Sequence, residues 1–251
     1  MPLRGGGVPR MYEWRAPMLG VLINAAAILV GGAIGLLIGG KIPARVRETV
    51  MQGLALSVLL VGLLSALKTQ DVLCVIVCLV LGALLGEWID IERRLTRLGE
   101  RLERLAPGGE GERSLVPGFV TASLVFCVGA MAVVGSLESG LTGNHGTLIA
   151  KSMMDGVGSV FFAAALGPGV LLSAAAIFVY QGAIALLAGS VAPVLTEPIV
   201  REMSAIGGLI IACIGLNMLG AVKVRVGNLL PGIFLPILYL PAFAWISALF
   251  G

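Results

Sequence analysis

Residues 135–159 read GSLESGLTGNHGTLIAKSMMDGVGS, and this polar stretch lies between two strongly apolar runs. It contains a glutamate, the only histidine of the chain, and a lysine and an aspartate four positions apart (Glu138, His145, Lys151 and Asp155). Runs of about twenty apolar residues recur along the chain, and each is long enough to cross the ~30 Å apolar core of a bilayer as a helix. The stretch is therefore expected to be the polar centre of a membrane-embedded region.

The composition of the whole chain indicates the same class of protein. Of its 251 residues, 58% are hydrophobic and 12% are charged, whereas globular domains carry about 25% charged residues. The apolar runs are continuous rather than alternating, which argues against a β-barrel. The sequence thus predicts an all-α, polytopic bundle of transmembrane helices.

The apolar runs predict eight candidate transmembrane spans. They cover residues 18–40, 49–67, 72–89, 116–134, 147–166, 169–187, 203–219 and 229–249. The Gly/Pro/Arg-rich residues 1–17 are expected to be a disordered extension, and a start at Met18 would remove them, leaving 18–251 as a single transmembrane domain. Because only three residues join the fifth and sixth spans, an alternative has 147–166 dip into the membrane without crossing it, giving seven crossings.

Positive charge predicts the orientation, since short loops rich in Lys and Arg stay in the cytoplasm. Such loops follow the first, third and seventh spans, and the loop after the third holds six arginines between residues 92 and 113. Eight spans place all three loops in the cytoplasm and both termini outside. Three arginines in the N-terminal tail (Arg4, Arg10 and Arg15) oppose this orientation.

An apolar stripe with coiled-coil spacing follows the third span. It consists of Trp88, Ile91, Leu95, Leu98, Leu102 and Leu105. It predicts a cytoplasmic amphipathic helix and loop at about 90–114. A homodimer seam, a helix lying on the membrane surface, and a solvated helix folded back on its own protein all remain open.

A local repeat relates the two halves of the chain. Arg47-Glu48 begins six residues before Gly53, and Arg201-Glu202 begins six residues before Gly207. The two matches are offset by 154 residues. With eight spans, spans 1–3 and 6–8 would run in opposite directions, so they are candidates for the inverted repeats that are common in secondary transporters.

Polar side chains within apolar runs are the candidate site residues, because such groups are costly in lipid and mostly face a protein interior or a cavity. They are Asn24, Lys151, Asp155, Gln181, Asn217 and, at the border of the last span, Asn228. The alternative is that the amides only join helices together. Gly156 and Gly158 could unwind the helix after Asp155, and three prolines (Pro231, Pro236 and Pro241) should break the last span. Glycines spaced by four at 31, 35 and 39, and at 82 and 86, predict close helix packing.

Several of these residues also fall in runs that resemble a known family. The run FCVGAMAVVGSLESGLTGN (126–144), followed by LIAKSMMDG (148–156), resembles the hallmark of the YqgA/YdfK-type bacterial inner-membrane proteins, a family of unknown function. LINAAAILVGGAIG (22–35) and VGNLLP (226–231) fit the same pattern. The resemblance implies a multi-pass protein of the bacterial inner membrane, and it marks Asn24, Glu138, Lys151, Asp155 and Asn228.

The function expected from these features is transport or channelling of a small solute or ion, with a polar site around Lys151 and Asp155. The alternative is a non-catalytic membrane partner that docks through the Arg-rich helix. An enzyme is not expected, because Ser152 points away from its neighbour Lys151 on a helix and a single histidine excludes most haem and His-metal chemistry. No phosphate-binding GxxxxGK[ST] loop is present. The lipid bilayer is thus the expected surrounding, with no cofactor, metal or nucleic acid.

Overall fold

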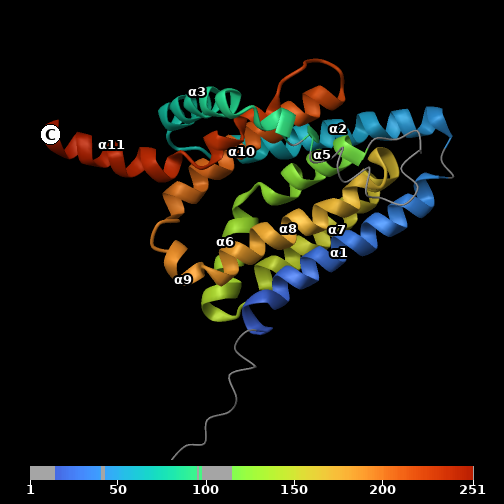
Figure 1. Ribbon diagram of the computed structural model, residues 1–251, viewed down its shortest axis with the longest axis horizontal. Coiled ribbons are helices and arrows are strands. Elements are labelled where there is room, and N and C mark those ends of the chain that lie inside the picture. Colours follow the sequence, from blue (N-terminus) through green and yellow to red (C-terminus); the bar gives the residue numbers. More distant parts are fainter. Residues whose placement is uncertain (1–14, 41–42, 95, 98–114, 251) are drawn as a thin grey trace, which may run out of the picture.

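The structure is a computed structural model that describes residues 15–40, 43–94, 96–97 and 115–250. Every regular element in these ranges is a helix, which agrees with the need to satisfy backbone hydrogen bonds internally in lipid. In chain order the elements are α1 (Arg15–Gly39), α2 (Ala44–Ala66), α3 (Val72–Ile89), α5 (Leu115–Cys127), α6 (Ala130–Thr142), α7 (Gly146–Leu166), α8 (Gly169–Leu186), α9 (Ala188–Val191), α10 (Glu197–Met218), the 3₁₀ helix η1 (Val226–Ile233) and α11 (Pro236–Phe250) (Figure 1).

Within the described ranges, six helices are long and apolar enough to cross a membrane, namely α1, α2, α3, α7, α8 and α10. Two pairs reach that length only together and are bent, α5 with α6 by 64° and η1 with α11 by 46°. If each bent pair is one span, the total is eight. The predicted polytopic helix bundle is therefore confirmed, and the two-residue link at 167–168 joins two full-length helices. Gly167 makes this tight turn with φ of +87°, a value that favours glycine.

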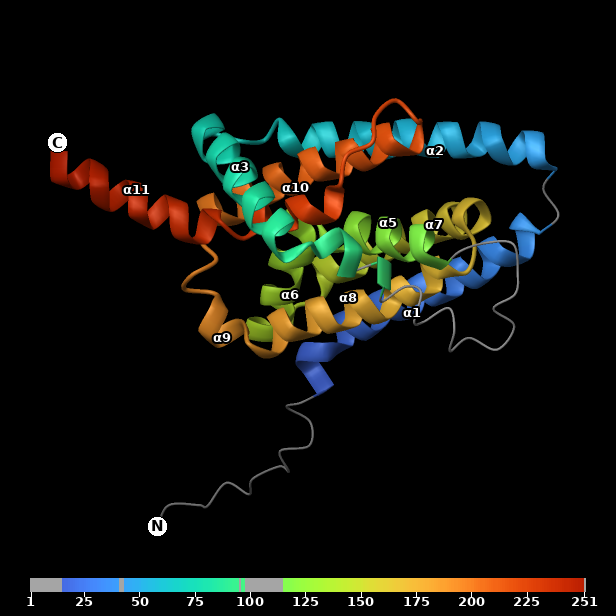
Figure 2. The same ribbon diagram turned by 45° about the horizontal axis from the view of Figure 1, so that its top comes forward.

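The helices pack in pairs that join distant parts of the chain. The most extensive contacts are those of α1 with α7 and of α2 with α10, and α3 packs on η1. Figure 2 shows α2 and α10 along one edge of the molecule and α1 with α8 along the opposite edge. The shorter helices α5 and α6 lie between these edges together with α7.

The predicted glycine faces allow the closest of these approaches. A Cβ atom at Gly31, Gly35 or Gly39 would overlap backbone carbonyl oxygens of α7. In the same way, Gly82 and Gly86 lie directly against the backbone of η1. These glycines thus let the helix backbones approach closely, because van der Waals packing drives helix association in lipid in place of the hydrophobic effect.

Two local expectations need correction. The fourth span is not one helix over 116–134, because the chain breaks at Gly129 (φ +125°) and α6 continues to Thr142. Conversely, α7 is continuous through Gly156 and Gly158, so the helix does not unwind after Asp155. Gly156 instead packs on α1. The last span is broken near its prolines, as predicted.

The apolar stripe after the third span does not lie on one uninterrupted helix. Asp90 adopts a left-handed conformation (φ 55°) and ends α3, and helix resumes at residue 91. Trp88 is largely exposed and Ile91 is half-buried. The other leucines of the stripe lie outside the described residues, as do residues 1–14 of the predicted N-terminal extension.

Candidate functional site

Four buried polar side chains from three helices form one hydrogen-bonded cluster, the Asp155 cluster. It contains Asn24 of α1, Lys151 and Asp155 of α7, and Gln181 of α8. Asn24 and Gln181 have no exposed surface, and only 6% of Lys151 and of Asp155 is exposed. The structure therefore brings together four of the seven predicted site residues.

The cluster is connected in series. Lys151 Nζ donates to both carboxylate oxygens of Asp155, at 2.8 Å to Oδ1 and 2.6 Å to Oδ2. Asn24 Nδ2 donates to Asp155 Oδ2 and to Gln181 Oε1, at 3.1 Å in each case. Asn24 therefore links the ion pair to the second amide.

Local sequence explains half of this arrangement, and helix packing explains the rest. The spacing of four puts Lys151 and Asp155 on the same face of α7. Asn24 lies two turns before Gly31 on α1, and the glycine contact with α7 holds Asn24 beside Asp155. Gln181 follows because α8 also packs on α1.

Two atoms of the cluster have no hydrogen-bond partner among the described residues. They are the acceptor Asn24 Oδ1 and the donor Gln181 Nε2. Leaving a buried polar group unsatisfied costs about 1–3 kcal/mol, so such groups usually bind protein or ordered water. The cluster is thus neutral overall and offers one open acceptor and one open donor.

The other predicted residues lie elsewhere and make local contacts. Glu138 accepts a hydrogen bond from Thr147 Oγ1 at 2.7 Å, which joins α6 to α7. Asn217 closes the loop between α10 and η1, donating to Val224 O at 2.7 Å and accepting from Val224 N at 2.9 Å. These contacts stabilise helix ends and a loop.

Asn228 lies where η1 meets the end of α3. Its Oδ1 accepts from the backbone N–H of Glu92 at 2.8 Å, and its Nδ2 donates to Glu87 Oε2 at 2.6 Å. Glu87 also pairs with Arg225. Asn228 therefore holds the close contact between Gly86 and η1 and is separate from the Asp155 cluster.

Glu202 is a buried carboxylate outside the predicted site residues, although it belongs to the local repeat at 201–207. It is 1% exposed, and it accepts from the backbone N–H of Gln70 at 3.0 Å and from Thr69 Oγ1 at 2.5 Å. Arg201 Nε lies 3.4 Å from its Oε1. This carboxylate ties the loop between α2 and α3 to the start of α10. The sequence offers little signal for its burial, because Arg201 stands beside it and the apolar run begins only at Met203.

In the described part of the chain, no three or more His, Cys, Asp or Glu side chains are close enough to hold a metal ion together. The nearest arrangement is the pair Cys74 and Cys78 on α3, whose Sγ atoms lie 3.8 Å apart. Ser152 Oγ donates to Leu148 O at 2.6 Å, so this hydroxyl is engaged by its own helix.

Comparison with known proteins gives a family and two relatives. Residues 19–240 match the family described as "Protein of unknown function (DUF554)". The chain is 29% identical to the "Uncharacterized protein YqgA" of Escherichia coli (strain K12) over 221 residues, which are 87% of this chain and 94% of the relative. It is 28% identical to the "Uncharacterized membrane protein YdfK" of Bacillus subtilis (strain 168) over 223 residues, with the same coverage. No solved structure matches the chain.

Proposed function

The chain belongs to the DUF554 family of proteins of unknown function, and we propose that it transports or conducts a small solute or ion through a pathway containing the Asp155 cluster. The resemblance to a protein named as a membrane protein, together with the apolar helices, supports a multi-pass membrane location. We further propose the bacterial inner membrane as that location.

The observation that carries this proposal is the buried ion pair with two unsatisfied amide atoms beside it. A charge at the centre of a bilayer costs about 2.5–3.5 kcal/mol on insertion scales. Pairing reduces that cost, but well-packed apolar residues of similar volume are often as stable or more stable. The open acceptor on Asn24 and the open donor on Gln181 give the cluster a capacity to bind that helix packing does not require.

The helix order adds support for a transporter architecture. Adding 154 to the bounds of α2 gives 198–220, against 197–218 for α10. The same offset carries α1 onto α8 and α9, and α3 onto η1 and α11. Each of α1 with α8, α2 with α10, and α3 with η1 is in contact, as expected for elements around a pseudo-two-fold axis. The hydrogen bond between Asn24 and Gln181 joins the first of these pairs.

The proposed activity moves a solute without covalent chemistry. The solute would be small, because the cluster offers two open hydrogen-bonding atoms and is otherwise internally paired. A transported species could replace the missing partners of Asn24 and Gln181 as it passes Asp155.

Flux measurements on liposomes containing the purified protein test the proposal. The probes are protons, Na⁺ and K⁺, followed with trapped dyes, and glycerol and urea, followed by light scattering. We expect at least one probe to cross faster than in protein-free liposomes. The variant combining Lys151→Met with Asp155→Leu should lose that flux, because it removes both charges without leaving either one unpaired.

The matched control is Glu197→Gln, which removes an exposed carboxylate at the start of α10. It should keep native flux. Native flux in the folded double variant would show that the ion pair is structural. Flux no faster than in protein-free liposomes for every probe would contradict transport of these classes of solute.

A further inference from the structure

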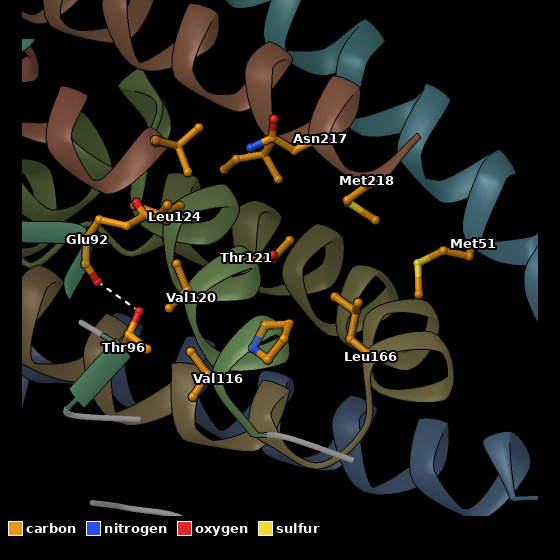
Figure 3. A pocket seen from close by; sticks show the side chains of 13 residues that line it. Met51, Glu92, Thr96, Val116, Val120, Thr121, Leu124, Leu166, Asn217 and Met218 are labelled. Carbon is orange, nitrogen blue, oxygen red and sulfur yellow. Dashed lines mark hydrogen bonds between the residues drawn. The ribbon is translucent and has the colours of Figure 1, made fainter. Parts of the chain in front are cut away.

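Two cavities lie in series between α5, α10 and η1. The first has a volume of about 440 Å³ and is lined by side chains of these elements together with Met51, Glu92, Thr96 and Leu166. Figure 3 shows Glu92 and Thr96 on one side of this cavity and Met218 and Met51 on the other. The second, of about 190 Å³, lies at the break between α5 and α6 and is lined by Cys127, Gly129 and Tyr180 among others.

From the first cavity to the second, the positions of the lining residues shift along each of the three elements. Along α5 and into the break they run from Val116 to Gly129, and along η1 and beyond from Val226 to Phe234. On the antiparallel helix α10 they run back from Met218 to Met203. The two cavities therefore follow one another along the same three elements.

Leu124 is the residue that lines both cavities. Its side chain is 7% exposed, and Figure 3 shows it at the end of the row of α5 residues that begins at Val116. A buried apolar side chain between two spaces large enough for water acts as a barrier to polar solutes, as hydrophobic constrictions do in channels.

The second cavity ends at the break between the two halves of the α5–α6 span. Cys127, the last residue of α5, lines this cavity. Tyr180 of α8 lines it too. The break at Gly129 interrupts the α5–α6 span at this depth and leaves room that a continuous helix would fill.

We infer that the two cavities are one access route from the Glu92 side of the protein to Cys127 at the break between α5 and α6, with Leu124 as its constriction. The purpose of the route rests on the proposed function. Among the described residues that line either cavity, Glu92 is the only one with a charged side chain. Its carboxylate makes the mouth of the route favour small cations over anions of the same size.

Thiol modification of the native Cys127 tests the route without knowledge of the solute. The parent protein carries Cys74→Ser, Cys78→Ser and Cys213→Ser, which leaves Cys127 as the only cysteine. The probe is the cationic, membrane-impermeant reagent 2-(trimethylammonium)ethyl methanethiosulfonate, applied to vesicles of each orientation. A second protein, with Thr96→Cys and Cys127→Ser in the same background, reports which side the mouth faces.

We expect Cys127 to react from the same side as the cysteine at position 96. Leu124→Ala should speed the reaction by about tenfold, which corresponds to a barrier lowered by roughly 1.4 kcal/mol, and Leu124→Trp should slow it. Leu60→Ala, at a position exposed on α2, should leave the rate unchanged. The anionic sulfonatoethyl reagent should react more slowly than the cationic one, and Glu92→Gln should reduce that difference.

The route is wrong if Cys127 reacts from the opposite side, if it reacts only with a lipid-soluble maleimide, or if folded Leu124→Ala leaves the rate unchanged. These outcomes are distinguishable from failure of the proposed function. If Cys127 is accessible and its reaction rate depends on Leu124, but no flux depends on the ion pair, the route is supported and transport is contradicted. If flux depends on the ion pair but Cys127 is inaccessible, transport is supported and the route is contradicted.

Discussion

Asp155 is the residue on which the buried cluster converges, because it accepts hydrogen bonds from Lys151 and from Asn24. Its carboxylate is compensated by one ammonium group, so neither charge is isolated in the apolar interior. Such a pair is weak evidence for stability by itself, since its desolvation offsets much of its attraction. The loss of one partner, however, leaves the other charge buried and uncompensated.

This asymmetry gives a prediction for stability at the residue scale. Lys151→Met alone should lower the free energy of unfolding by about 3–5 kcal/mol, because it leaves the Asp155 carboxylate without its cation. The variant that combines Lys151→Met with Asp155→Leu should be less destabilised than the single variant. Thermal unfolding of the detergent-purified proteins, followed by tryptophan fluorescence, measures the difference. A double variant less stable than Lys151→Met would contradict this account of the pair.

Residue spacing predicted the ion pair but not the amides that complete it. Lys151 and Asp155 are four apart on one helix, so their contact is local. Asn24 lies 131 residues from Asp155 and 157 from Gln181, and those contacts depend on how α1 packs against α7 and α8. For the same reason, Glu138 and Asn217 could not be separated from the cluster by sequence reasoning alone.

At the scale of the helices, glycine has two different uses. On α1, Gly31, Gly35 and Gly39 bring two backbones into close contact. At Gly129 the backbone has φ of +125° and the span is broken. The sequence pattern distinguishes these uses poorly. Regular spacing predicted the packing face, whereas the break occurs at a glycine with no such periodicity, and Gly156 and Gly158 in α7 cause none.

The packing face predicts the effect of adding a single methyl group. Gly35→Ala should destabilise the protein by about 1–3 kcal/mol, the usual cost of overpacking, because the new Cβ would overlap the carbonyl oxygen of Val160. Gly53→Ala is the matched control. Position 53 lies inside α2 with open space around it, so alanine there should stabilise the helix by about 1 kcal/mol.

Both variants can be compared by thermal unfolding in the same detergent. Equal effects at the two positions would mean that the contact between α1 and α7 is looser than described. Because that contact also holds Asn24 beside Asp155, Gly35→Ala should in addition reduce any flux that depends on the Asp155 cluster.

At the scale of the whole molecule, loop charge predicts the orientation in the membrane. The arginines between residues 92 and 113 favour the cytoplasm, and eight crossings then place both termini outside. In intact cells, an impermeant maleimide should label Asn144→Cys, in the exposed turn between α6 and α7, and should not label Gly108→Cys. Each variant is made in a background without native cysteines, and permeabilised cells provide the control for reactivity. Labelling of position 108 in intact cells would reverse the orientation.

The sequence by itself determined that this is a helical membrane protein, where most of its spans lie, and which charged residues share a helix face. These properties are local, because every backbone hydrogen bond of a lipid-embedded helix is made within a few residues of itself. Tertiary packing alone decided which helices are neighbours, and hence that Asn24 and Gln181 join Asp155 while Asn228 and Glu202 hold loops. It also decided where Leu124 separates two cavities. Those outcomes depend on contacts between helix faces more than a hundred residues apart in the chain, where side-chain volume and close backbone approach select the partner.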